Sequence, residues 1–178
     1  MKRLFVLIFF AFAVQPAMSQ AILKPVDESS KVGFTIKNFG LNVGGNFKGL
    51  KGSIRFDPAK PEESEIDVTV DANSINTDNT KRDNHLRQEE YFNVAKFPVL
   101  QVKSIKVSGS ATTGYTMDGN ITIKGVSKKI SIPFKAAAQN GGYLFTGEFE
   151  ISRRDFEVGG KSAVMSDNLK VSLSIFAK

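Results

Sequence analysis

Residues 114–139 of the chain read GYTMDGNITIKGVSKKISIPFKAAAQ, and apolar and polar side chains alternate on both sides of Gly125. Alternation with a period of two is typical of β-strands that bury one face and expose the other. The short glycine-bearing segment 124–126 between the two runs predicts a tight hairpin that joins antiparallel neighbours. The apolar positions of the two runs are Tyr115, Met117, Ile121 and Ile123, then Ile130, Ile132, Phe134 and Ala136.

The same alternation recurs along most of the chain, with apolar positions in one phase within residues 32–36, 50–56, 66–72, 143–151 and 169–175. Between Val99 and Val107 the phase changes, which predicts a β-bulge near Ser104. The pattern indicates about eight antiparallel strands in one all-β domain, without an internal repeat or a linker. Closing such a sheet into a barrel removes its exposed edges, and eight strands enclose either a packed core or one small ligand.

One segment departs from the alternation. Thr80 and Asp83 match a capping box, which predicts a short helix from about Lys81 to Glu90. Aromatic residues follow directly at 91–92 and 97. A charged helix followed by aromatic residues is expected to lie across one end of the barrel, with the aromatic side chains pointing inward.

The N-terminus reads as a targeting segment rather than as part of the fold. Lys2 and Arg3 precede an apolar run over residues 4–14, and Ala17-Met18-Ser19 supplies small residues for cleavage. This layout predicts a signal peptide over 1–19, a single domain over 20–178, and a periplasmic or secreted protein. The run is too short to span a bilayer, and the absence of cysteine argues against a lipoprotein.

Composition excludes several chemistries. The 178 residues contain no cysteine, no tryptophan and one histidine, His85, so disulfide scaffolds, thiolate metal sites and cysteine nucleophiles are excluded. We expect no metal site. Nucleic-acid binding is not expected, because the lysines are scattered rather than clustered. The polar outward face of the strands argues against a membrane-spanning barrel.

Phenylalanines are concentrated on the inward phase. Each could simply pack a core, but the set as a whole also fits a cavity lined for a lipid. The candidate pocket residues are Phe34, Ile36, Ile54, Phe56, Val68, Val70, Phe92, Phe97, Phe134, Phe145, Phe149, Ile151 and Phe156.

Five segments, in order, resemble the signature of the YceI-like family: RDNHLR at 82–87, YFNV at 91–94, KFP at 96–98, GNITIKGV at 119–126 and ISRRDFEVG at 151–159. The resemblance covers essentially the whole chain after the targeting segment. It implies an extended, lipocalin-like, eight-stranded antiparallel barrel, typically periplasmic, whose cavity holds a polyisoprenoid or similar amphiphile. It implies no established catalysis.

The chain departs from the family pattern at three positions. Ser29 and Asn38 stand where the family often has histidines, and Glu157 replaces a glycine. No role of those histidines is carried over to this chain.

Two functions remain open from the sequence. The first is an exported, soluble, non-enzymatic carrier for an isoprenoid-type lipid, such as a polyprenyl phosphate or a quinone, with no other cofactor and with a homodimer plausible. The alternative is an enzyme acting on a lipid-like substrate with His85 as general base.

Four polar residues are head-group or structural candidates. His85 and Arg87 are expected to tie the helix to neighbouring backbone or to Asp155. Arg153 shares the inward phase of Ile151, so it either meets a ligand head group or pairs with a carboxylate.

Overall fold

The computed structural model describes residues 21–178, so the expected signal peptide lies outside the described residues. The described chain forms nine strands, one α-helix and three short 3-10 helices. The strands are β1 (Ile22–Leu23), β2 (Lys31–Asn38), β3 (Leu41–Arg55), β4 (Glu65–Asn76), β5 (Val99–Ser110), β6 (Gly114–Ile123), β7 (Val126–Gln139), β8 (Gly142–Ser152) and β9 (Met165–Ala177). The helices are α1 (Thr80–Leu86), η1 (Asp27–Ser29), η2 (Pro61–Glu63) and η3 (Arg153–Phe156).

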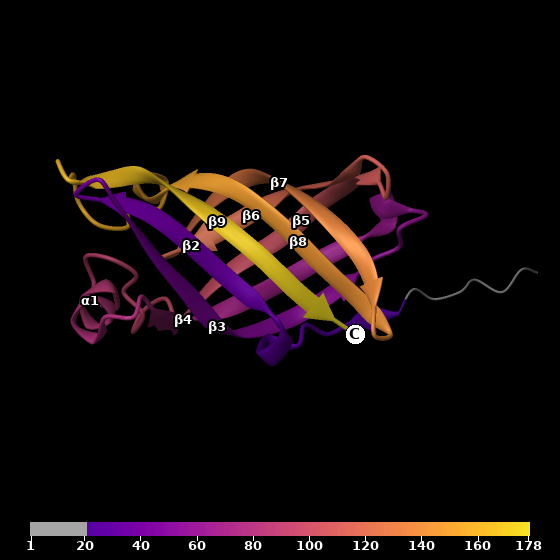
Figure 1. Cartoon of the computed structure of the whole chain (residues 1–178), viewed down its shortest axis with the longest axis horizontal. Coiled ribbons are helices and arrows are strands. Elements are labelled where there is room, and N and C mark those ends of the chain that lie inside the picture. The colour runs from indigo at the N-terminus through magenta and orange to yellow at the C-terminus, as the bar shows by residue number, and fades with distance from the viewer. Residues whose placement is uncertain (1–20) are drawn as a thin grey trace, which may run out of the picture.

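The sheet closes on itself. Its order is β1-β3-β2-β9-β8-β7-β6-β5-β4, and a further pairing of β3 with β4 joins the two sides into an elongated antiparallel barrel (Figure 1). Eight strands form the closed wall, and β1 adds two residues beside Ile54 and Arg55. The predicted eight-stranded barrel with a short helix near one end is therefore confirmed. The additional strand β1 was not predicted, because two residues are too few to show an alternating pattern.

Closure depends on β3, the longest strand. Its first half, up to Phe47, pairs with β2, and its second half, up to Arg55, pairs with β4. The register shifts twice along the β3–β4 pairing, around Lys48. Because bulges increase local twist and bend a strand, these shifts allow one strand to turn from one side of the barrel to the other.

The predicted bulge near Ser104 is present. The β5–β6 register shifts between Ser104 and Lys106, which leaves Ile105 as an extra residue that is 65% exposed. Val107 beyond it is fully buried. The bulge thus explains why apolar residues at even positions before it and at odd positions after it point into the same barrel interior.

The helix is shorter than expected and is capped differently. It ends at Leu86 rather than near Glu90, and its N-cap is Asn79, whose side-chain oxygen accepts the Arg82 N–H at 3.0 Å. The predicted capping box of Thr80 is wrong, because the Asp83 carboxylate accepts from Thr77 instead.

The early end of the helix also has a physical cause. The Phe92 N–H bonds back to the Leu86 carbonyl, and the Phe92 ring packs edge-on against Phe47 inside the barrel. Burial of this ring turns the chain away from the helix axis.

The two ends of the barrel differ in the elements and side chains that cover them. The mouth end carries α1, the β2–β3 and β6–β7 hairpins and the loop 153–164, which hydrogen bonds hold together, including those from Phe39 N–H to the Val164 carbonyl and from Gly159 N–H to the Glu90 carbonyl. The opposite end contains an aromatic plug of stacked, tilted and edge-to-face rings. Its members are Phe56, Tyr115, Phe134, Tyr143 and Phe145, with centroid separations of 5.1–6.2 Å. Burial raises the pKa of the Tyr115 phenol, so this ring stays neutral within the plug at physiological pH.

Glu157 follows η3 with φ of 55°, in the left-handed region. This conformation costs a residue with a Cβ about 1–2 kcal/mol, whereas glycine adopts it freely. We expect Glu157→Gly to raise the free energy of unfolding by about 0.5–1 kcal/mol in a urea titration. Glu150→Gly, within strand β8, is the control and should lower it by a similar amount. Equal destabilisation by both substitutions would contradict the assignment of strain to Glu157.

Candidate functional site

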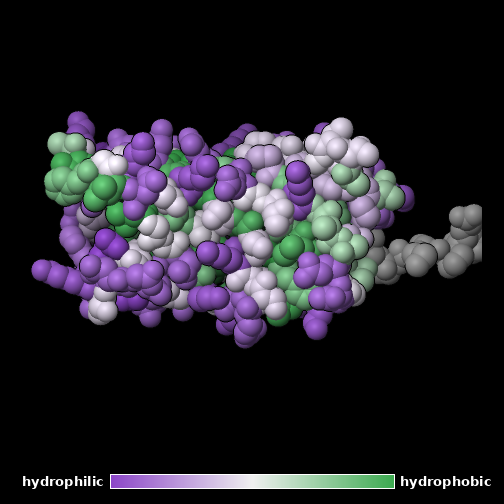
Figure 2. Space-filling view, in the orientation of Figure 1, coloured by the Kyte–Doolittle hydropathy of each residue, from purple (hydrophilic) through white to green (hydrophobic). Residues whose placement is uncertain are grey.

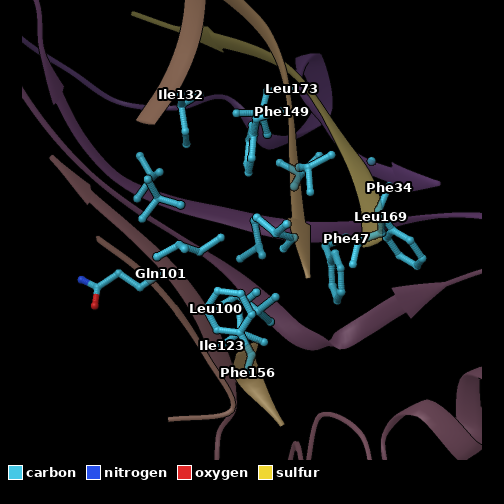
Figure 3. Close-up of a pocket in the computed structure, with 18 of the residues that line it drawn as sticks. Phe34, Phe47, Leu100, Gln101, Ile123, Ile132, Phe149, Phe156, Leu169 and Leu173 are labelled. Atoms are coloured by element: carbon cyan, nitrogen blue, oxygen red, sulfur yellow. The ribbon is translucent and has the colours of Figure 1, made fainter. Parts of the chain in front are cut away.

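The barrel encloses an apolar cavity of about 240 Å³. Side chains from strands on all sides of the wall converge on it, and Figure 3 shows Phe34, Phe47, Phe149 and Phe156 among them. The lining extends from Phe134 and Phe145 of the aromatic plug up to the mouth end. Because a modest volume is spread along most of the barrel, the space is narrow and suits a linear chain better than a wide ring system.

Most of the predicted pocket residues lie on this cavity. Those that line it are Phe34, Ile36, Ile54, Val68, Val70, Phe92, Phe134, Phe145, Phe149, Ile151 and Phe156. Their contact with a lipid stays a prediction. The pocket residues that lie on strands can be predicted from alternation alone, because every second side chain of a barrel strand points into the interior.

Phe56 and Phe97 do not line the cavity. Phe56 is buried, but it sits in the aromatic plug, where its ring meets Tyr115 at 5.1 Å. Phe97 lies outside the barrel, against Gly125 of the β6–β7 hairpin, with the Lys96 ammonium 5.3 Å from its ring centroid. Alternation along a strand shows which face of the sheet a side chain occupies, but not where it lies along the barrel axis. Phe97 lies in a turn segment, where this alternation does not apply.

Polar side chains reach the cavity at its mouth. Asn38, Thr77 and Arg82 line it there, beside Met165. The Gln101 amide, by contrast, bonds to Asp67 and points away from the other labelled side chains in Figure 3. A dry tunnel with polar groups at one end is the arrangement that an amphiphile requires.

Two arginines line the cavity, Arg153 and Arg82. Arg82 comes from helix α1. Its Nε donates to the Thr77 hydroxyl at 2.8 Å and its Nη2 to the Thr77 carbonyl at 2.7 Å. Within residues 21–178, Nη1 makes no hydrogen bond and Arg82 joins no ion pair. The guanidinium is therefore positioned by Thr77 and keeps donors available for a ligand.

A second, polar pocket of about 480 Å³ shares five lining residues with the apolar cavity, namely Gly33, Phe34, Val43, Thr77 and Arg82. It lies against β2 and β3. Its other lining residues are Lys31, Thr35, Asn42, Gly44, Gly45, Asn46, Asp78 and Ser172. Arg82 thus stands where an apolar space and a polar one meet. The sequence reasoning did not select it, although it opens the RDNHLR segment.

The other residues of that segment differ in their roles, since Leu86 lines the cavity whereas Arg87 is structural. Arg87 donates to the main-chain carbonyls of Asn73 and Ile75 at 2.9 Å, which ties α1 to β4 as expected. His85 is 61% exposed, lies edge-on to Tyr91 and is 3.7 Å from Glu90. It lines neither pocket, because the helix turns it outward.

Arg153 is only 4% exposed and anchors the loop before β9. Its Nη1 donates to the carbonyls of Val158 and Gly160, and its Nε donates to the carbonyl of Ser166. Its Nη2 forms an ion pair with Asp167 at 2.7 Å. Most of its donors are therefore engaged, which favours the scaffold role over a head-group role.

Asp155 does not take the expected part. It is exposed, and neither His85 nor Arg87 hydrogen-bonds to it in the described part of the chain. Of the two expected partners, Arg87 therefore takes the neighbouring backbone and not Asp155, because η3 turns Asp155 to solvent while Arg153 is buried.

Within residues 21–178, no group of three or more histidine, cysteine or acidic side chains is placed to hold a metal ion. In the same part of the chain, no helix combines the length and the apolar character needed to cross a bilayer.

Comparison with known proteins places the chain in a family. The family model of the YceI-like domain matches residues 24–177. The chain belongs to the YceI-like family. A UPF0312 protein of Yersinia enterocolitica is 34% identical to it over 149 residues, which cover 80% of this chain and 77% of that protein.

Solved structures agree with this fold. The chain is similar to BcnA of Burkholderia cenocepacia, with a TM-score of 0.82, 22% identity, and coverage of 86% of this chain and 99% of that one. It is also similar to a polyisoprenoid binding domain from Saccharophagus degradans, with a TM-score of 0.70, 17% identity, and coverage of 90% and 99%. At these identities the likeness concerns the architecture of the YceI-like barrel.

The scaffold role of Arg153 can be tested. Arg153→Gln leaves buried carbonyls without donors, so we expect a loss of about 2–3 kcal/mol in unfolding free energy by denaturant titration. Arg154→Gln is the matched control, since Arg154 makes one side-chain bond, to the Gly159 carbonyl, and should lose less than about 1 kcal/mol. A stable Arg153→Gln protein with a selective loss of anionic ligand would restore the head-group role.

Proposed function

We propose that this protein is an exported carrier that binds an isoprenoid-type amphiphile, with the tail in the barrel and the head at the mouth. The observation that carries the proposal is the narrow apolar cavity, which is blocked by the aromatic plug at one end and bordered by Arg82 at the other. The predicted signal peptide supports export.

The tail supplies most of the expected affinity. Each buried CH₂ contributes about 0.8 kcal/mol, so one five-carbon isoprene unit contributes about 4 kcal/mol at most. Few polar contacts are then needed inside the tunnel. This agrees with a cavity whose lining residues are mostly apolar.

The head is proposed to be anionic. Arg82 faces both the apolar cavity and the polar pocket, and its free Nη1 donors suit phosphate oxygens. A polyprenyl phosphate therefore fits the two spaces better than a quinone, whose head carries no charge.

Relatives support a binding role. The Saccharophagus degradans domain of similar fold is described as polyisoprenoid binding. The enzyme alternative is less well supported, because His85 lies on the outer surface and borders neither pocket.

The tail site is tested by filling the cavity. Ile151 lines it, and its neighbour Glu150 is exposed on the outer face of the same strand. We expect Ile151→Trp to weaken binding of a polyprenyl phosphate at least roughly tenfold, because excluding two CH₂ groups costs about 1.6 kcal/mol. Glu150→Trp should bind as the unchanged protein does. Titration of both variants with the lipid, alongside thermal melts, gives the comparison; equal affinities would contradict a tail site in this cavity.

The head site is tested with a matched pair of ligands. Arg82→Gln should weaken a polyprenyl phosphate by roughly tenfold, since a charge-assisted hydrogen bond contributes about 1.5 kcal/mol or more. Binding of the uncharged polyprenol of equal length should be unchanged. Lys81→Gln, next to Arg82 but outside both pockets, serves as the control. A similar loss for both ligands would show that Arg82 supports the fold rather than the head group.

A further inference from the structure

An apolar patch surrounds part of the cavity mouth. Phe39 and Leu41 at the tip of the β2–β3 hairpin are 73% and 72% exposed, and Val164 of the adjoining loop is 42% exposed. The Phe39 N–H bonds to the Val164 carbonyl, so the hairpin and the loop form one surface, the mouth patch. Figure 2 shows hydrophobic colour gathered at this end of the molecule, where Figure 1 places the hairpin and the loop.

Phe39 is an unusual choice for its position. Three two-residue hairpins of this barrel place a non-glycine residue and then a glycine at positive φ, namely Phe39-Gly40, Lys124-Gly125 and Asn140-Gly141. Asparagine is favoured at the first position, and a bulky side chain in the left-handed region is an outlier. Here the residue with the strained backbone carries a phenyl ring that faces water. The strain does not favour folding, and the exposed ring does not favour solubility. Such an observation points to a contact made outside the chain.

Two further features identify that contact. Asn38 and Met165, each next to a patch residue in sequence, line the cavity, so the patch borders the entrance itself. Lys37 and Lys161 are exposed close to Phe39 and Val164 in sequence, whereas the exposed Asp155 and Glu157 of the same loop lie farther along the chain from Val164. Apolar side chains that insert below head groups, with lysines beside them, fit the interface of an anionic bilayer.

We propose that the mouth patch docks the barrel end-on onto an anionic lipid bilayer, with Phe39 and Leu41 inserted and the cavity opening toward the membrane. This inference rests on the proposed carrier function and extends it. An isoprenoid tail would then pass between bilayer and cavity without crossing water, because the patch and the lining are continuous at Asn38 and Met165.

The test uses the chain from residue 20 and flotation with vesicles of phosphatidylcholine and phosphatidylglycerol in equal parts. The variant Phe39→Asn with Leu41→Thr removes both apolar side chains, and the asparagine matches Asn140 of the equivalent hairpin, so the fold should be retained. We expect vesicle binding to fall roughly tenfold or more. The control Ile105→Asn removes an exposed apolar side chain that lies elsewhere, on β5, and should bind as before. High salt and vesicles of phosphatidylcholine alone should both weaken binding.

Further readouts separate the proposals. The double variant should keep its affinity for a polyprenyl phosphate added in solution but transfer it between vesicles several-fold more slowly. Vesicle binding that depends on the patch, without any uptake of isoprenoid, would support docking and contradict the carrier function. Docking is overturned if the unchanged protein does not float with vesicles, or if Ile105→Asn loses as much as the double variant. It is also overturned if sedimentation shows a dimer that the double variant dissociates, because a second copy of the chain then covers the patch.

Discussion

Closure of the sheet through β3 is the constraint on which the rest of the structure depends. One strand pairs with β2 along its first half and with β4 along its second, so the main-chain groups of both sides find partners within the wall. Without this double pairing the sheet would have two long exposed edges. Closure also creates an interior, and the proposed carrier function depends on what that interior holds.

The two ends of the barrel differ in the side chains that line the interior. At one end, five aromatic rings fill the interior and close it. At the other end, Thr77 and Arg82 line the interior beside the rings of Phe47 and Phe92. Helix α1 contributes through its attachment rather than through its exposed face, since Arg87 bonds it to the β4 main chain. The proposed ligand is therefore expected to enter at the end that carries Arg82.

Much of the fold is readable from the sequence because strand alternation is a local signal. It predicts the strands, the tight hairpin at Lys124-Gly125 and the bulge at Ser104, all of which the structure contains. It predicts which face of a strand Phe149 or Val70 presents. These properties depend only on neighbours along one strand.

What the sequence does not reveal depends on height along the barrel axis and on contacts between distant segments. Phe56 has inward parity but lies at the plug, and Phe97 packs outside on Gly125. The partners of Arg153 are carbonyls of a loop without periodic pattern. The placement of Arg82 at the mouth follows from its bonds to Thr77, which no spacing rule anticipates.

The central claim is that the cavity holds an isoprenoid-type lipid in the cell, and one measurement addresses it directly. The protein, purified from its native compartment without detergent, is extracted with organic solvent, and the extract is analysed by mass spectrometry. The account predicts an isoprenoid amphiphile, in near-equal molar amount to the protein and depleted in the Ile151→Trp variant. Recovery of no lipid, from a protein that also fails to bind added polyprenyl phosphate, would contradict it.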